Sequence, residues 1–221
     1  MSEKNYARID KKLLNKKTYF FQLWSTFLIV YPLMRLFYNI KITGKENIPK
    51  DKKCIFAPNH ISYLDPHLVF IATKRPMTYM AKQELFHNKF LANVMPKLGA
   101  FAVNREKLEV STIKSVKDIM KTKEWNLCIF PQGGIFRNKK IEKINRGFTV
   151  IAKMSKTDII PMSITGSEKY NWIPFIGKIE VKIGKPISWE LSDEEIFEQW
   201  GSQVSQMANY EFVHEKETVQ S

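Results

Sequence analysis

Short, continuous apolar runs recur along this chain and alternate with stretches of helical periodicity. A strand made from such a run carries apolar side chains on both faces, so both faces must be covered. Strands are expected at residues 54–57, 77–80, 100–103, 127–130, 159–164 and 179–183. Helices are expected at residues 66–73, 83–95, 108–123 and 148–155, with a last helix after the capping box at 192–195. The pattern predicts α/β architecture: a single sandwich domain with a mostly parallel or mixed central sheet covered by helices.

The first 41 residues differ in composition from the rest. No charged residue occurs between Thr18 and Met34, a run of 17 positions that is dense in aromatic side chains. A membrane-spanning helix needs about 20 apolar residues, so this run is at the lower limit. Residues 1–41 also contain eight Lys or Arg against two acidic residues. This mixture is typical of a helix lying in the headgroup region of an anionic bilayer, and predicts a membrane-anchoring helical arm over residues 1–41. The alternative is a helix packed on the core of the chain's own domain.

The overall charge also favours an anionic partner. The chain has 35 Lys and Arg residues against 22 acidic ones, a formal net charge of +13. Nucleic acid, an anionic membrane face and a phosphorylated substrate all fit this charge, but no nucleic-acid-binding motif of the usual kinds is present. Cys54 and Cys128 both lie in apolar runs, which predicts buried thiols in a reducing compartment and neither disulfide nor metal cluster.

Asn59, His60 and Asp65 directly follow the first apolar run. Imidazole is the side chain whose ordinary pKa lies nearest neutrality, so it can take up and return a proton. A carboxylate within hydrogen-bonding reach fixes the tautomer of the ring and stabilises the imidazolium. We therefore predict that His60 is a general base and that Asp65 orients it. The structural alternatives are a helix cap for Asp65 and a turn contact for Asn59.

Three more segments come at the ends of expected strands, where α/β proteins gather ligand-binding groups. They are the segment 98–105, the glycine-containing basic loop 130–140 and the strand 159–164. With the first motif, this set resembles the glycerolipid acyltransferase family, the group that contains bacterial 1-acyl-glycerol-3-phosphate acyltransferases. The residues that match its four motifs are Asn59, His60 and Asp65; Gly99 and Arg105; Phe130, Pro131 and Gly133; and Ile160 and Pro161.

The third motif departs from the family pattern F-P-E-G-T-R. Gln132 stands where the family has glutamate, Gly134 where it has threonine and Ile135 where it has arginine. The nearest guanidinium is that of Arg137, which is therefore a candidate for phosphate binding. These departures motivate a different lysophospholipid as the alternative acceptor, and a non-catalytic membrane-binding protein as a further alternative.

The resemblance implies acyl transfer from a thioester, either acyl-CoA or acyl carrier protein, to the free sn-2 hydroxyl of lysophosphatidic acid. It implies that residues 42–221 form the acyltransferase domain, that no metal or cofactor is needed, and that phosphatidic acid is the product. The expected location is the cytoplasmic face of the plasma membrane, with an anionic bilayer and no nucleic acid as partner. Besides the catalytic pair, the residues expected to contact substrate are Asn59, Lys82, Gly99, Arg105, Gln132, Gly133, Gly134 and Arg137, with Pro131 and Pro161 as structural residues. For Lys82 the alternative is a lysine at a helix start that faces water.

Overall fold

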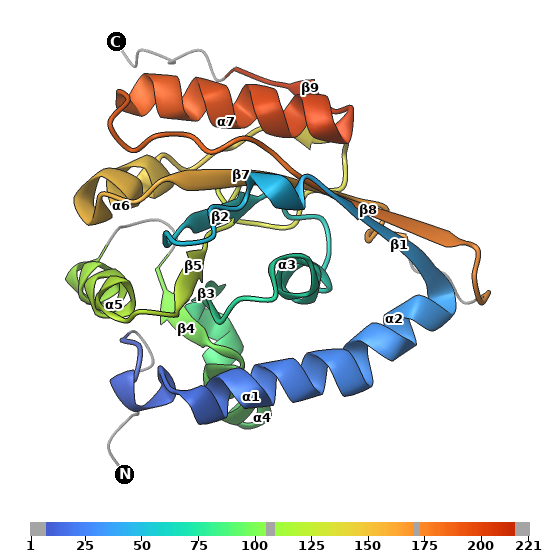
Figure 1. Ribbon diagram of the computed structural model, residues 1–221, viewed down its shortest axis with the longest axis horizontal. Coiled ribbons are helices and arrows are strands. Elements are labelled where there is room, and N and C mark those ends of the chain that lie inside the picture. Colours follow the sequence, from blue (N-terminus) through green and yellow to red (C-terminus); the bar gives the residue numbers. More distant parts are fainter. Residues whose placement is uncertain (1–7, 105–108, 170–172, 215–221) are drawn as a thin grey trace.

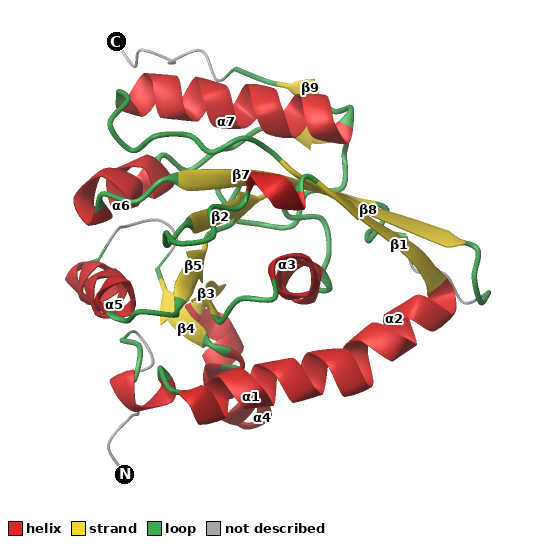
Figure 2. Cartoon of the chain, in the orientation of Figure 1, coloured by secondary structure: helices red, strands yellow, loops and turns green. Residues whose placement is uncertain are grey.

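A seven-stranded sheet forms the centre of the computed structural model, which describes residues 8–104, 109–169 and 173–214 (Figure 1). The strand order is β1-β8-β7-β2-β5-β3-β4, and every neighbouring pair is parallel except the antiparallel pair β7 and β8. Helices cover both faces of this sheet (Figure 2). The predicted α/β sandwich with a mixed, mostly parallel sheet is confirmed.

The elements have the following bounds. The strands are β1 (Tyr38–Thr43), β2 (Ile55–Pro58), β3 (Met77–Lys82), β4 (Ala100–Val103), β5 (Asn126–Cys128), β6 (Lys140–Ile141), β7 (Ile159–Thr165), β8 (Gly177–Ile183) and β9 (Glu211–Phe212). The helices are α1 (Lys16–Trp24), α2 (Tyr31–Phe37), α3 (Asp65–Thr73), α4 (Lys89–Val94), α5 (Val110–Lys121), α6 (Gly147–Ser155) and α7 (Asp193–Ala208). A π-helical stretch (Ser25–Val30) joins α1 to α2, and the three form one N-terminal helix, Lys16–Phe37.

The residues around β2 show why the apolar runs are continuous. Cys54 and Phe56 pack on one face of the sheet, with α3 and the N-terminal helix. Ile55 and Ala57 pack on the other face, with α5, α6 and α7. Trp200 of α7 also donates its indole N–H to the carbonyl of Ala57 at 2.8 Å, which ties this helix to the end of β2. Each residue of the run is buried in one of two cores, as the pattern predicts.

The helix expected at residues 83–95 is divided in two. A 3₁₀ turn (Gln83–His87) comes first, and Asn88 then caps α4. The Asn88 side chain accepts hydrogen bonds from the amides of Phe90 and Leu91, at 2.9 and 3.2 Å. Because this side chain satisfies the first amides of a new helix, the earlier turn ends at Asn88.

Strand β1 is not among the strands expected from the sequence. The boundary expected at residue 41, between the arm and the acyltransferase domain, falls inside this strand. β1 pairs in parallel with β8 from Tyr38 to Thr43 at the edge of the sheet. The helical part of the arm ends at Phe37, and the chain passes from there directly into the sheet.

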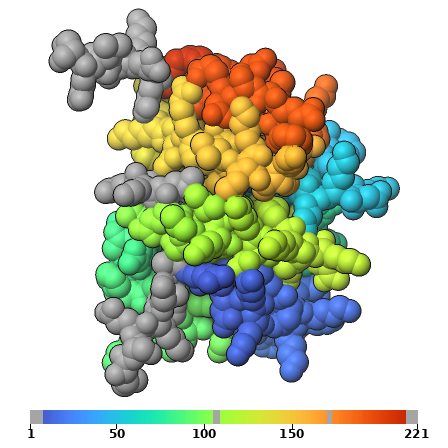
Figure 3. Space-filling model, turned by 90° about the vertical axis from the view of Figure 1, so that its left-hand side faces the viewer, coloured from blue at the N-terminus to red at the C-terminus, as the bar shows by residue number. Residues whose placement is uncertain are grey.

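The beginning of the arm is fixed to α5. The amide of Ile9 donates to the hydroxyl of Ser115 at 3.1 Å, and Arg8 and Lys11 form ion pairs with Asp118 at 3.3 and 3.0 Å. Figure 3 shows the blue N-terminal segment lying against the green-to-lime segment that contains α5. The first described residues of the arm are therefore attached to the domain, as its end is through β1.

Gln22 fixes the middle of the N-terminal helix to the sheet. Its amide nitrogen donates to the carbonyls of Met77 and Leu98 at 2.7 and 2.8 Å, and its oxygen accepts from the amide of Met77 at 3.4 Å. Gly99 makes this approach possible, since a Cβ at that position would lie 2.5 Å from the Gln22 nitrogen and 2.3 Å from the Met77 oxygen. The backbone of Gly99 also has a φ of +82°, which favours glycine.

The two faces of the N-terminal helix differ in how far their side chains are exposed to solvent. Its inner face carries the buried polar residues Thr18, Gln22 and Thr26 together with apolar side chains that pack on the core, among them Met34 and Phe27, whereas its outer face exposes large apolar side chains. These exposed side chains are Phe20, Phe21, Trp24, Leu28, Ile29, Leu33 and Leu36. By length and composition the helix is also able to cross a membrane, with a mean hydropathy of 1.3 in its most apolar window. The sequence leaves two alternatives for this segment, a helix in the headgroup region of a membrane and a helix packed on the core of the domain. The inner face fits packing on the core, and the outer face fits a membrane.

The two cysteines should be chemically inert in the folded protein. Burial raises the pKa of the Cys54 thiol to about 11 and that of Cys128 well above its usual range. Because the thiolate is the nucleophile, neither should react with iodoacetamide at mildly alkaline pH, and both should react once urea unfolds the chain. Mass spectrometry of the alkylated protein checks this, and an alkyl group on the native protein would contradict it.

Candidate active site

Loops that follow parallel strands converge at one edge of the sheet. β2 ends just before Asn59 and His60, and β7 ends just before Ser167. β5 leads into the loop at 130–137. Because β2 is parallel to both β5 and β7, the carboxyl ends of the three strands meet at the same edge.

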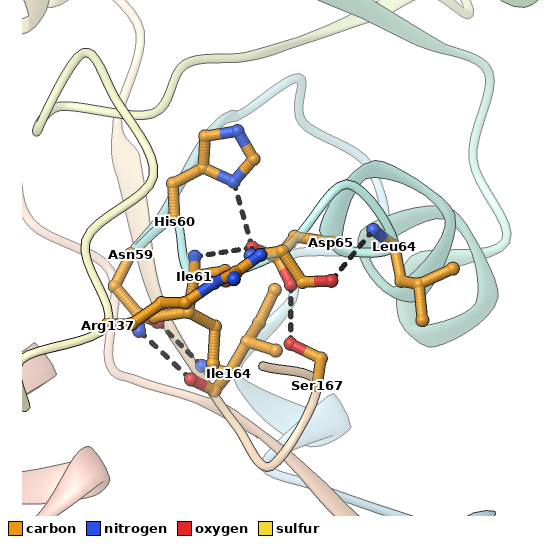
Figure 4. Close-up of polar contacts among 9 residues, drawn as sticks. Asn59, His60, Ile61, Leu64, Asp65, Arg137, Ile164 and Ser167 are labelled. Atoms are coloured by element: carbon orange, nitrogen blue, oxygen red, sulfur yellow. Dashed lines mark hydrogen bonds and ion pairs between the residues drawn. The ribbon is translucent and has the colours of Figure 1, made fainter. Parts of the chain in front are cut away.

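The carboxylate of Asp65 is the centre of this site (Figure 4). Its Oδ2 lies 2.8 Å from Nδ1 of His60 and accepts hydrogen bonds from the amides of Ile61 and Ser62, at 2.7 and 2.8 Å. Its Oδ1 accepts a hydrogen bond from the hydroxyl of Ser167 at 2.7 Å. Because the carboxylate is the acceptor in these contacts, Nδ1 of His60 carries the hydrogen. Nε2, on the opposite side of the ring, is left with its lone pair.

Asp65 holds its own loop closed as well as orienting the ring. It is the first residue of α3, with Pro66 in the first turn, and its carboxylate bonds amides that precede the helix. A second loop supports the same backbone: the amide of Phe136 donates to the carbonyl of His60 at 2.8 Å, and Nε of Arg137 donates to the carbonyl of Ile61 at 3.1 Å. The position of the imidazole is therefore fixed from two sides.

The His60 ring faces a cavity of about 510 Å³ that is lined mostly by apolar side chains. The ring stacks on Phe130, with centroids 4.0 Å apart and planes 28° apart. Gln22 and Thr26 contribute to the wall, so the N-terminal helix is part of the site. His67, which has no distinguishing context in the sequence, also lines the cavity, and burial lowers its pKa. The volume is within the range of small-molecule sites, about 300–1,000 Å³.

Asn59 lies behind this site and not in it. Its side chain is fully buried and forms two hydrogen bonds with the backbone of Ile164 in β7, donating to the carbonyl at 2.9 Å and accepting from the amide at 2.7 Å. Both of its polar atoms are thus occupied by the neighbouring strand. Asn59 therefore supports the site through the backbone of β7, a role of the same kind as the turn contact, and its contact with substrate stays a prediction.

Gln132 and Gly99 are also placed away from the cavity. The buried amide nitrogen of Gln132 donates to the carbonyls of Lys140 and Glu142, at 3.3 and 3.4 Å. Gly99 lies under Gln22, where it allows the N-terminal helix to dock. Neither residue lines the cavity that His60 faces, and their contact with substrate stays a prediction.

The other predicted residues surround the site. Lys82, at the end of β3, lines the cavity and pairs with Glu84 at 3.0 Å. Gly133 and Pro131 line an adjoining hollow of about 130 Å³, which shares Met80 and Phe130 with the main cavity. The loop that contains Gly134 and Arg137 passes beside the His60 backbone. Pro161 is buried in β7, and Arg105 lies outside the described residues.

Ser167 is a site residue that the sequence patterns do not reveal. It is fully buried and donates to Asp65 from 102 positions further along the chain. The only sequence signal is its place two residues after β7, a strand whose carboxyl end meets that of β2. Within the described part of the chain, no group of three or more His, Cys, Asp or Glu side chains is placed to hold a metal ion.

Comparison with known proteins agrees with this geometry. Residues 39–165 match the family model described as Acyltransferase. The chain is 32% identical over 149 residues to a 1-acyl-sn-glycerol-3-phosphate acyltransferase of Bacillus subtilis (strain 168), which covers 67% of this chain and 73% of that protein. It is 30% identical over 185 residues to a protein of the same description from Streptococcus pneumoniae (strain ATCC BAA-255 / R6), covering 81% and 68% of the two chains.

The crystal structure of the 1-acyl-sn-glycerophosphate (LPA) acyltransferase from Thermotoga maritima has a similar fold. It superposes with a TM-score of 0.64 and 20% sequence identity, covering 90% of this chain and 80% of that one. At this identity the likeness shows the shared fold.

Removing the Asn59 side chain should destabilise the protein. Asn59→Ala leaves the buried carbonyl and amide of Ile164 without partners. We expect a loss of about 2–6 kcal/mol in the free energy of unfolding, from about 1–3 kcal/mol for each of the two buried groups. Urea titration followed by circular dichroism measures it. The exposed Asn93 of α4 is the control, and Asn93→Ala should change stability by less than about 0.5 kcal/mol. Equal effects of the two substitutions would contradict the supporting role.

Proposed function

This chain belongs to the acyltransferase family, and we propose that it transfers a fatty acyl group from an acyl thioester to the sn-2 hydroxyl of lysophosphatidic acid, giving phosphatidic acid. Both bacterial relatives described above carry the name of a 1-acyl-sn-glycerol-3-phosphate acyltransferase. The observation that carries the proposal is the buried His60–Asp65 pair, in which Asp65 holds Nδ1 of an imidazole that lines an apolar cavity. That is the arrangement that activates an alcohol for attack on a thioester.

His60 acts as general base and then as general acid. Its Nε2 removes the proton of the acceptor hydroxyl as the oxygen attacks the carbonyl carbon of the thioester. Asp65 stabilises the imidazolium that forms, through the bond to Nδ1. When the tetrahedral intermediate collapses, the carbon–sulfur bond breaks and the thiolate takes the proton back from Nε2. The acceptor hydroxyl has the role of the serine in a catalytic triad, so no covalent acyl-enzyme is formed.

The oxyanion of the intermediate needs hydrogen-bond donors close to His60. The amides of Ile61 and Ser62 are used by Asp65, and the amide of Gly133 donates to the carbonyl of Phe130 at 2.9 Å. We assign the oxyanion contact to the amides of Gly134 and Ile135, because Ile135 lines the cavity beside His60. The glycine-containing loop at 130–140 then stabilises the intermediate by hydrogen bonds to its oxyanion.

The substrates have an apolar acyl chain and a charged phosphate, and the site has an apolar cavity and basic side chains. The apolar cavity suits a fatty acyl chain, since each buried methylene is worth about 0.8 kcal/mol. The acceptor phosphate fits the basic groups of the site: Lys82 in the cavity wall and Arg137 beside Ile61. Arg105, which follows β4 in the sequence and lies outside the described residues, is proposed to bind it as well, on the family resemblance. Guanidinium groups bind phosphate in a bidentate manner, which is the reason for assigning the two arginines to it.

The N-terminal helix is proposed to lie in one leaflet of the membrane, on the cytoplasmic face. A helix that turned away from the domain to span the bilayer would break the bonds from Gln22 to Met77 and Leu98. In its docked position the outer apolar face is free to enter lipid, and the basic residues that flank the helix favour anionic headgroups. A lysolipid in that leaflet then reaches the cavity without leaving the membrane.

Replacing the base should remove the activity and leave the fold intact. We expect His60→Ala to lower the rate of acyl transfer by at least about 10²- to 10⁴-fold, the usual contribution of a general base. The assay follows phosphatidic acid by mass spectrometry, with lysophosphatidic acid as acceptor and acyl-CoA or acyl carrier protein as donor. His87→Ala, at an exposed histidine, is the matched control and should retain full activity. Full activity of His60→Ala would refute the mechanism.

Ser167 should act through Asp65 as a positioning residue. Ser167→Ala removes the hydroxyl that donates to Oδ1, and we expect kcat to fall about tenfold with KM nearly unchanged, since a hydrogen bond to a charged group is worth about 1.5–3 kcal/mol. Ser167→Thr keeps a hydroxyl and should restore most of the rate. A threonine variant as slow as the alanine variant, or a change confined to KM, would exclude this role.

A further inference from the structure

The loop between β7 and β8 carries exposed apolar side chains that the proposed reaction does not use. Ile173, Phe175 and Ile176 are 62%, 73% and 61% exposed. We call these three side chains the loop patch. Scattered single apolar residues are normal on a surface, but a group within four consecutive positions indicates a binding surface.

The loop patch adjoins the outer face of the N-terminal helix. The amide of Phe175 donates to the carbonyl of Leu36, in the last turn of α2, at 2.9 Å. In Figure 1 this loop lies just beyond the end of α2, in line with the N-terminal helix. Leu33 and Leu36 are themselves exposed, so the apolar surface of the helix continues into the loop patch.

The charges around the loop patch suit an anionic surface. Lys169 precedes it, Lys178 follows it, and both are exposed. No acidic residue occurs in the sequence between Glu168 and Glu180. Apolar side chains flanked by lysines fit the boundary between anionic headgroups and acyl chains.

The backbone conformation of Phe175 independently supports a binding surface at the loop patch. Phe175 has a φ of +64°, in the left-handed region that residues other than glycine and asparagine rarely adopt. In this conformation the aromatic side chain is 73% exposed. Local strain of this kind gathers at sites that bind a partner.

We infer that the loop patch is a second membrane-insertion point, which enters the same leaflet as the outer face of the N-terminal helix. This inference rests on the proposed membrane attachment of that helix. The loop patch lengthens the membrane-binding surface beyond the end of α2. The loop patch then holds the α2 end of the helix, beside the start of β1, against the lipid surface.

A fluorescent probe on the loop tests the inference directly. Cys54 and Cys128 are fully buried, so Ile176→Cys offers one accessible thiol for an environment-sensitive dye such as NBD. The full chain is mixed with vesicles of phosphatidylglycerol and phosphatidylcholine in equal parts. We expect a blue shift of the dye, and quenching by phospholipids that carry a nitroxide on the acyl chain. The matched control is Val150→Cys, an exposed position on α6, which packs on the opposite face of the sheet.

The Val150 dye should keep its aqueous spectrum while the protein is bound to vesicles. A dye at position 176 that also remains in water would overturn the inference, as would a chain that does not bind vesicles. Acyl transfer by the labelled protein is measured separately in detergent micelles. Insertion of the loop without acyl transfer would refute the proposed reaction alone, and acyl transfer with a water-exposed loop would refute this inference alone.

A double substitution measures the contribution of the loop patch to binding. Phe175→Asn with Ile176→Ser removes the apolar surface, and asparagine tolerates the positive φ at position 175. We expect vesicle partitioning to fall at least about tenfold, since burial of one large apolar side chain is worth that much or more. Val150→Asn should partition like the unmodified protein, and equal partitioning of the double variant would also overturn the inference.

Discussion

The buried carboxylate of Asp65 is the interaction on which the site depends. An ionised group with no exposure to water is costly unless donors surround it, and here four hydrogen bonds do so. Two come from the amides of its own loop, one from the His60 ring and one from Ser167. The same contacts that make the charge tolerable therefore close the loop, fix the tautomer of the ring and join β2 to the end of β7. In the proposed function, one group thus serves both the stability of the site and its chemistry.

In the proposed function, the N-terminal helix joins this chemistry to the membrane through its outer face, which exposes large apolar side chains. Its inner face packs apolar side chains such as Met34 on the core and places Gln22 against two backbone carbonyls beside Gly99. Gln22 and Thr26 also line the cavity that His60 faces. A change in how this helix docks would therefore alter the wall of the cavity, which links membrane attachment to substrate binding in the proposed function.

Local patterns in the sequence predict the two-sided sheet, because each apolar run such as 54–57 must be covered on both faces. Spacing and family resemblance lead to the contact between His60 and Asp65, only five positions apart. What the sequence misses depends on pairing between distant segments. Ser167 reaches Asp65 across 102 positions, and β1 is an edge strand with alternating burial that directly follows an apolar helix. Asn59 and Gln132 were expected at the substrate because motif membership identifies important positions but not the direction of a side chain.

The tautomer of His60 tests the central claim most directly. Long-range ¹H–¹⁵N correlation spectra of the ¹⁵N-labelled protein in detergent micelles distinguish the protonated ring nitrogen from the free one. We predict that the hydrogen of the His60 ring lies on Nδ1, held by Asp65, and that Nε2 is the free base. A hydrogen on Nε2 would contradict it, because that nitrogen then has no lone pair with which to accept the proton of an acceptor hydroxyl.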